Sequence, residues 1–275
     1  MERLIQVAIT ASALTATMAC GGVQAAEKPT IALVHGAWEE SNVWGNVTPK
    51  LKADGYKVIV ITMPGRPNNP VPVNKISLDL YRDTIIKSIA KERHPVVLVG
   101  HSFAGMTISA VAEAEPSKIK TLVYLAAYLP KNGQSLLDLG NSDKDSKIGP
   151  FLKIMKDQGI AVVDGAGRAD LFCNLCPPQL RAAVPNLIVD EPLAPLVTPV
   201  HLTSDRFGKV DKVYVHTAQD VVVSPSLQAS MLMATPVRLE LTLDTGHTAF
   251  LTDPDGVAAA IEKAASPVEI GANAR

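Results

Sequence analysis

A strand, a sharp turn and a helix follow one another around Ser102, and this order limits the possible folds more than any other stretch. The β-branched apolar run 95–99 has the length of a buried strand, and an Ala-, Ile- and Val-rich helical pattern continues to about Ala114. The backbones of strand and helix pass close together at such a turn, so the residues two places from the serine must be small. Gly100 and Ala104 meet this requirement. The stretch predicts a nucleophile elbow, with a plain structural turn as the alternative.

Apolar runs of strand length alternate with helical patterns along most of the chain. Each run is hydrophobic over its whole length, which is typical of strands that helices cover on both faces of a parallel sheet. The sequence therefore predicts an α/β fold with a six-stranded, mainly parallel sheet and helices on both faces. The expected strands are 30–35, 57–62, 95–99, 119–126, 212–216 and 237–243. The expected helices are 44–55, 78–90, the helix after Ser102, 225–233 and 255–265.

The regular alternation stops between residues 128 and 203. This stretch contains repeated prolines and a charge cluster, and it is too long and irregular for one crossover. Its apolar residues indicate that it packs on another part of the protein. We expect a helical cap at 128–203, inserted over the strand ends of an α/β core formed by 27–127 and 204–275. A surface excursion without a function is the alternative.

The first 26 residues have the pattern of a secretory signal peptide. Arg3 gives a positive start, residues 4–19 are apolar and small, and residues 23–25 offer an A-x-A-like cleavage site. We expect this segment to be removed and the protein to be exported, as a periplasmic or secreted protein. A disordered N-terminal extension is one alternative, and a lipoprotein anchored at Cys20 is another.

Removal of this segment leaves two cysteines, Cys173 and Cys176. An even pair in an exported protein indicates a disulfide. The C-x-x-C spacing also occurs in redox motifs and zinc sites, but no second cysteine pair accompanies it here. We expect a structural disulfide, with two free thiols as the alternative.

Composition limits the classes of partner. The 275-residue chain is 47% hydrophobic and has a formal net charge of -1, so nothing favours a nucleic-acid partner. No stretch has the length and flanks of a transmembrane segment. We expect a small-molecule ligand, no metal, no cofactor and no integral membrane segment, and a homodimer remains an alternative to a monomer.

Three polar residues of complementary chemistry follow three separate expected strands: Ser102, Asp220 and His247. The carboxyl ends of parallel strands meet at one edge of a sheet, so these side chains are expected to lie together. A serine hydroxyl becomes a good nucleophile when an imidazole takes its proton, and a carboxylate holds that imidazole in one tautomer. Each residue alone has an ordinary explanation as a cap or a turn. Their combination, in the order Ser, Asp, His, predicts a catalytic triad.

Acyl transfer also needs two backbone N–H groups that point at the developing oxyanion. Phe103, directly after the serine, supplies one, and Ala37 in the loop after the first strand is our candidate for the second. We expect His35 to brace that loop, and we assign His101 to packing behind the site.

Four motifs carry a resemblance to a known family: 33–38 (LVHGAW), 100–105 (GHSFAG), 213–220 (VYVHTAQD) and 246–254 (GHTAFLTDP). Through them the chain resembles α/β-hydrolases of the branch that holds plant methyl esterases, hydroxynitrile lyases and bacterial carboxylesterases of the pyrethroid type. The resemblance covers nearly all of the expected mature chain and is weak in the cap. It implies Ser102 as nucleophile, His247 as base, Asp220 as the residue that orients the base, and the N–H groups of Ala37 and Phe103 as the oxyanion hole.

Two positions separate the branches of this family. The related lyases carry a threonine in the first loop, where this chain has Gly36, and a lysine after the catalytic histidine, where it has Thr248. Both departures favour an esterase, because they leave room for an alcohol group and offer no cation for a cyanide. A serine at position 102 also separates the chain from haloalkane dehalogenases and epoxide hydrolases, which resemble it but carry an aspartate nucleophile.

The sequence therefore predicts an exported serine hydrolase that cleaves carboxylic esters with a hydrophobic acyl or alcohol group through an acyl-enzyme. The residues expected to line its pocket are Trp38, Leu125, Phe151, Phe172 and Phe250. Two alternatives stay open. The same triad could hydrolyse a lactone, thioester or amide or act as a lyase, or the fold could serve as a ligand receptor without turnover.

Overall fold

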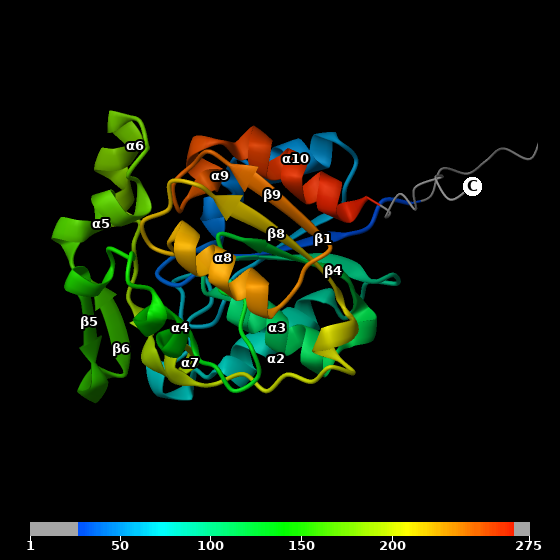
Figure 1. Ribbon diagram of the computed structural model, residues 1–275, viewed down its shortest axis with the longest axis horizontal. Coiled ribbons are helices and arrows are strands. Elements are labelled where there is room, and N and C mark those ends of the chain that lie inside the picture. Colours follow the sequence, from blue (N-terminus) through cyan, green and yellow to red (C-terminus); the bar gives the residue numbers. More distant parts are fainter. Residues whose placement is uncertain (1–26, 267–275) are drawn as a thin grey trace, which may run out of the picture.

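Six parallel strands form the centre of the computed structural model, which describes residues 27–266 (Figure 1). Their order across the sheet is β2-β1-β3-β4-β8-β9, and each neighbouring pair is parallel. The predicted fold class is confirmed. The strands are β1 (Ile31–Val34), β2 (Val58–Ile61), β3 (Val96–His101), β4 (Ile119–Leu125), β8 (Asp211–Thr217) and β9 (Leu239–Leu243).

Helices cover both faces of the sheet because the strands carry hydrophobic side chains on both. In β1, Ala32 and Val34 belong to one buried cluster, whereas Ile31 and Leu33 belong to the other. Figure 1 shows α9 and α10 above the strands and α2 and α3 below them. One layer contains α2 (Leu78–Ile89), α3 (Ala104–Ala114) and α8 (Pro225–Ala234). The opposite layer contains α1 (Thr48–Ala53), α9 (Ala249–Thr252) and α10 (Pro254–Ala265).

The first helix differs from the expected continuous helix at 44–55. The chain instead forms a 3-10 helix at Ser41–Gly45 and begins α1 at Thr48. Pro49 explains the new start, because proline has no N–H to donate and fits best in the first turn of a helix. Gly55, with φ of 81°, reverses the chain after the last turn.

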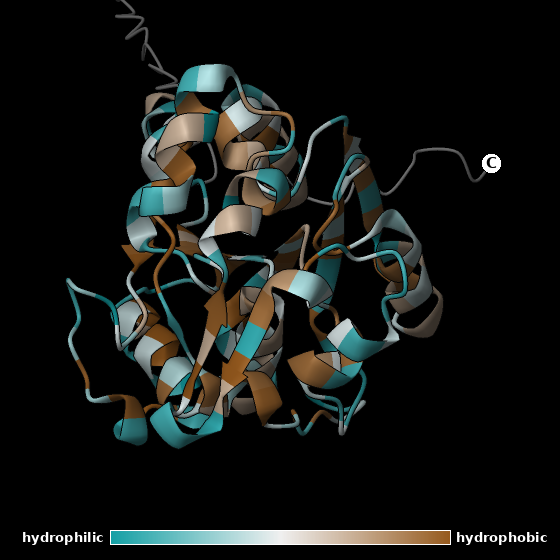
Figure 2. Ribbon diagram, turned by 90° about the vertical axis from the view of Figure 1, so that its left-hand side faces the viewer, coloured by the Kyte–Doolittle hydropathy of each residue, from teal (hydrophilic) through white to brown (hydrophobic). Residues whose placement is uncertain are grey.

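The segment between β4 and β8 forms a layer beside the carboxyl ends of the strands (Figure 1). The sequence predicts helical pieces here, and the structure adds a three-stranded antiparallel sheet in the order β5-β6-β7. We call residues 128–203 the cap. The boundaries of this segment as a separate domain are those predicted from the sequence. Seen from the cap side in Figure 2, its helices carry hydrophobic and hydrophilic residues on the same turns. The cap contains α4 (Leu136–Ser142), β5 (Leu152–Met155), β6 (Ile160–Val163), α5 (Gly165–Phe172), α6 (Pro178–Ala183), β7 (Glu191–Pro192) and α7 (Leu193–Val197).

The expected signal peptide at 1–26, with Cys20, lies outside the described residues. Within residues 27–266, none of the helices combines the length and the apolar character that a membrane span requires.

A buried ion pair joins the cap to the core. Glu191, at the start of β7, receives a hydrogen bond from the guanidinium of Arg66 in the loop after β2, and both side chains are at most 1% exposed. The same carboxylate accepts the hydroxyl of Tyr81 at 3.0 Å and the backbone N–H of Trp38 at 2.8 Å. A buried carboxylate with this many donors is stable only while its cation stays in place.

Replacing Arg66 with methionine should therefore leave Glu191 charged and unpaired in the interior. We expect Arg66→Met to lower the free energy of unfolding by about 3–5 kcal/mol. Arg82→Met is the matched control, because it removes ion pairs to Asp79 and Asp83 on the surface, which are worth at most about 1 kcal/mol. Urea unfolding of both variants gives the comparison, and equal losses would contradict a special role for the buried pair.

Candidate active site

The backbone at Ser102 has a left-handed conformation, with φ of 54°. Strand β3 and helix α3 approach so closely that a Cβ at Gly100 would lie 3.0 Å from the backbone of Ala104. A Cβ at Gly105 would overlap the carbonyl oxygen of Tyr128. The close approach of the two elements thus requires a small residue at Gly100, as the sequence predicts, and the loop after β4 requires one at Gly105.

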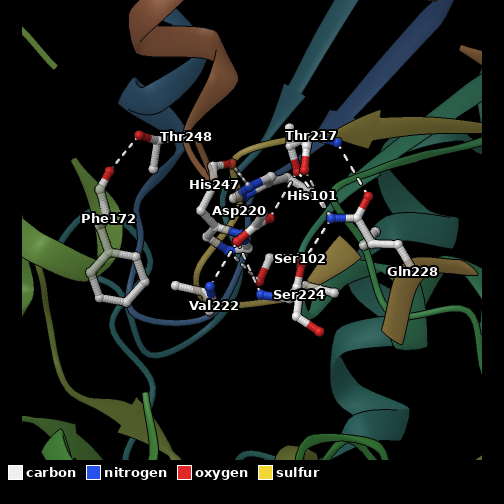
Figure 3. A network of polar contacts seen from close by, with 12 residues as sticks. His101, Ser102, Phe172, Thr217, Asp220, Val222, Ser224, Gln228, His247 and Thr248 are labelled. Carbon is white, nitrogen blue, oxygen red and sulfur yellow. Dashed lines mark hydrogen bonds and ion pairs between the residues drawn. The ribbon is translucent and has the colours of Figure 1, made fainter. Parts of the chain in front are cut away.

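Ser102, His247 and Asp220 form one chain of hydrogen bonds at the carboxyl edge of the sheet (Figure 3). The Nδ1 atom of His247 lies 2.8 Å from Oδ2 of Asp220, and its Nε2 atom lies 3.0 Å from Oγ of Ser102. Since an ionised carboxylate only accepts, Nδ1 carries the proton and Nε2 offers its lone pair to the serine hydroxyl. This arrangement suits removal of the proton from Ser102.

Asp220 is fixed by donors on both of its oxygens. Oδ1 accepts the backbone N–H groups of Val222 at 2.8 Å and Val223 at 3.0 Å. Oδ2 accepts the hydroxyl of Thr217 at 2.8 Å in addition to the ring of His247. These bonds hold the carboxylate in one orientation.

Ala37 and Phe103 place two buried backbone N–H groups next to the serine loop. Among the described residues, neither group donates to a protein acceptor. Buried N–H groups without an acceptor are rare in folded proteins, because they cost free energy. Two of them beside a serine are suited to bind an oxyanion.

The cap holds the loop that carries Ala37. Trp38 has a left-handed backbone with φ of 60°, and all three of its polar groups bond to the cap. Its N–H donates to Glu191, its carbonyl accepts the N–H of Val189 at 3.0 Å, and its indole N–H donates to the carbonyl of Ala161 at 2.9 Å. Trp38, expected in the pocket, thus joins the cap to the loop that carries Ala37.

His35 braces the same loop as a neutral ring. Its Nδ1 lies 2.9 Å from the carbonyl oxygen of Gly36, and its Nε2 accepts the N–H of Met63 at 3.1 Å. These partners require a proton on Nδ1 and none on Nε2. Burial, and then the nearby charge of Arg66, lowers the pKa of His35 to about 4.

A cavity of about 110 Å³ lies between the cap and the core, and Thr248, the residue after His247, is part of its lining. It includes Phe172 and Phe250 of the five expected pocket residues, whereas Trp38, Leu125 and Phe151 are not part of its lining. Leu125 lies instead in the core cluster that contains α10, and Phe151 packs against α5. The cavity is lined by Glu39, Asn42, Val43, Phe172, Val184, Leu187, Ile188, Thr248, Phe250 and Leu251.

Gly36 has a different role from the one expected. A Cβ there would lie 2.9 Å from Cβ of Ser102 and 3.0 Å from both Oε2 of Glu39 and Nδ1 of His101. The space is therefore filled by the site itself and is not left open for an alcohol group. Glycine is needed because the loop passes directly over the serine.

Thr248, next to His247, donates its hydroxyl to the carbonyl oxygen of Phe172. The bond joins the histidine loop to the cap and, as expected, this position supplies no cation. The ring of Phe172 lies 6.1 Å from the ring of His247, measured between centroids.

The two cysteines that follow Phe172 are joined by a disulfide, Cys173–Cys176. Within the bridged turn, Asn174 donates to the carbonyl oxygen of Gln219 at 2.9 Å. Gln219 directly precedes Asp220, so the bridged turn of the cap rests on the loop that carries the carboxylate.

Glu39 and Glu191 contribute to the site although the sequence analysis assigned them no role. Glu39 contacts His101, 62 positions away, and Glu191 contacts Trp38, 153 positions away. No local sequence motif predicts contacts between residues so far apart. The one signal in the sequence was the charged residue Glu39 inside the loop after the first strand. Among residues 27–266, no three His, Cys, Asp or Glu side chains are placed to hold a metal ion.

Comparison with known proteins identifies the family of the chain. Residues 31–260 match the family model described as "Alpha/beta hydrolase family". The chain belongs to this family. As an α/β-hydrolase it is 30% identical, over 82% of its length, to putative methylesterase 11 of Arabidopsis thaliana, and it spans 61% of that protein.

Two further related proteins are matched over nearly their whole length. Methylesterase 7 of the same plant is 26% identical over 82% of this α/β-hydrolase and 91% of the relative. The solved structure of a pyrethroid hydrolase from Sphingobium faniae JZ-2 superposes with a TM-score of 0.78 at 22% identity, over 86% of this chain and 97% of that one. The likenesses confirm the predicted resemblance to the methyl esterase branch, and the second shows the fold.

The tautomer of His35 predicts a pH dependence of stability. Its folded pKa of about 4 lies below the ordinary value of 6.5, so the neutral ring stabilises the fold fully above pH 6.5. This contribution, about 3 kcal/mol, is lost as the pH falls from 6.5 towards 4. Urea unfolding at pH 7.5 and 4.5 should show a larger loss for the native protein than for His35→Asn, with the exposed His94→Gln as control. Equal losses in His35→Asn and the native protein would contradict the assignment.

Proposed function

We propose that this α/β-hydrolase is an exported serine esterase that cleaves carboxylic esters with a hydrophobic acyl or alcohol group. One observation carries the proposal: Ser102 lies 3.0 Å from a histidine whose other nitrogen lies 2.8 Å from a buried carboxylate. Two N–H groups without acceptors lie beside that serine. Such a set of groups fits attack on a carbonyl carbon and stabilisation of the resulting oxyanion.

The reaction proceeds in two halves. Oγ of Ser102 attacks the ester carbonyl while Nε2 of His247 takes its proton, and the N–H groups of Ala37 and Phe103 bind the oxyanion. His247 returns the proton to the leaving alcohol, which gives an acyl-enzyme. His247 then takes a proton from water while the water oxygen attacks the acyl carbon, and it returns that proton to Oγ of Ser102 as the ester bond breaks and the acid leaves.

The proposed substrate class rests on the relatives and on the cavity. The names of the relatives include methylesterases and a pyrethroid hydrolase. The cavity that Thr248 and Phe172 line together is formed mainly by apolar side chains, with Glu39 as its one charged residue, and Ser102 and His247 are not part of its lining. It suits a small apolar group of an ester. Export is proposed from the N-terminal pattern, and the disulfide is compatible with an oxidising compartment.

The triad is tested by hydrolysis of p-nitrophenyl butyrate. We expect Ser102→Ala, His247→Ala and Asp220→Asn each to lower kcat by about 10³-fold or more, with circular dichroism unchanged. The losses should not add in the double variant Ser102→Ala/His247→Ala, because the residues act as a unit. If Asp220→Asn kept near-native activity, the carboxylate would have to be another residue, with Asp244 as the next candidate.

The lyase alternative is tested with mandelonitrile. The lyase branch needs a cation beside the leaving cyanide, and Thr248 has its hydroxyl committed to Phe172. We expect no release of benzaldehyde that depends on Ser102. Cleavage that disappears in Ser102→Ala would assign a lyase, and ligand binding without turnover of any ester would favour the receptor alternative.

A further inference from the structure

His101 lies between the two loops of the proposed active site and contacts both. Its Nδ1 atom is 3.0 Å from Oε2 of Glu39, and its Nε2 atom is 2.9 Å from the backbone carbonyl oxygen of His247. The Oε2 atom of Glu39 also accepts the N–H of Gly36 at 2.7 Å. One continuous chain of hydrogen bonds therefore runs from the oxyanion loop to the backbone of the catalytic histidine.

The partners of His101 determine its charge. A carboxylate oxygen and a backbone carbonyl oxygen can only accept hydrogen bonds, so both ring nitrogens must carry a proton. The ring is thus an imidazolium, and it is completely buried. Glu39, which is 4% exposed, is its counter-ion.

The balance of burial and charge agrees with this assignment. Burial alone would lower the pKa of His101, but the charge and hydrogen bond of Glu39 raise it overall. Burial alone would raise the pKa of Glu39, but the charge and hydrogen bond of His101 lower it overall. Each group keeps the other ionised.

The position of the imidazolium relative to the catalytic ring matters for the chemistry. The rings of His101 and His247 lie 4.7 Å apart, measured between centroids, with Glu39 on the far side of His101. The positive end of the pair faces His247, and Asp220 faces the same ring from the β8 side. The remaining titratable ring beside His101, that of His35, is held neutral by Gly36 and Met63.

We propose that His101 and Glu39 form a positioning pair that orients the oxyanion and histidine loops and sets the lower pH limit of activity. The inference deepens the proposed esterase function and rests on it. Without the imidazolium, the negative charge of Glu39 would act on the ring of His247 uncompensated.

Removing only the cation is the decisive test. In His101→Gln the carboxylate of Glu39 loses its counter-ion, so the pH at which kcat/KM is half-maximal on the acid side should rise by about one unit. The double variant His101→Gln/Glu39→Gln removes both charges and keeps amide hydrogen bonds, so its acid limb should return most of the way to the native position. The variant His94→Gln, at an exposed position two residues before β3, controls for the loss of a histidine.

A merely structural role predicts a different pattern. Both variants would then lose kcat to a similar extent, and the acid limb would stay at the native pH. That result, or an acid limb that stays displaced by one unit in the double variant, would overturn the charge role.

The protonation of His101 is measured separately in the native protein by 15N NMR of the histidine rings. We expect one buried ring to keep both N–H groups from pH 5 to 8, and Glu39→Gln to remove this signature at pH 7. A single N–H on His101 at pH 7 would overturn the proposal. This readout needs no substrate, so a failure of the esterase assignment and a failure of the pair are distinguished.

Discussion

The carboxyl edge of the sheet depends on three non-glycine residues with left-handed backbones. Trp38, Ser102 and Ala126 have φ values of 60°, 54° and 47°, and they follow the neighbouring strands β1, β3 and β4. Such conformations cost on the order of 1–3 kcal/mol each and persist where surrounding bonds impose them. Here the ladder continues past the strands, because the N–H of Ser102 reaches the carbonyl of Leu125 and the N–H of Ala126 reaches that of Val215. The sheet therefore fixes the direction in which the serine hydroxyl leaves it.

The fold and the triad were predictable because both follow from local patterns repeated along the chain. Each strand is apolar over its whole length, which is what a sheet covered on both faces requires. Parallel strands bring their carboxyl ends to one edge, so Ser102, Asp220 and His247 are placed together once the strands are placed. The structure brings these three side chains within hydrogen-bond distance, while their catalytic roles rest on the proposal and its kinetic test.

The pocket was not predictable, because it is built where the cap meets the core. Leu125 ends its strand at the carboxyl edge of the sheet, where the site lies, yet its side chain lies in the core on the α10 face. Trp38 is next to the oxyanion loop in sequence, yet its polar groups all bond to the cap. The role of His101 depends on Glu39, which lies in another loop. Such contacts follow from how two layers pack, and neither periodicity nor motif spacing carries that information.

Buried carboxylates orient two loops of the site in the same way: Glu39 and Glu191 act on the loop after β1, and Asp220 acts on the loop after β8. Each carboxylate binds a cation or His247, and each also accepts a backbone N–H from the loop that it orients. The N–H donors are those of Gly36, Trp38 and Val222. Desolvation offsets much of the attraction within a buried ion pair, so such pairs add little net stability. These pairs contribute orientation, because a carboxylate that accepts a backbone N–H fixes the plane of that peptide group. A site that needs two N–H groups aimed at one oxygen depends on fixed peptide planes more than on additional free energy.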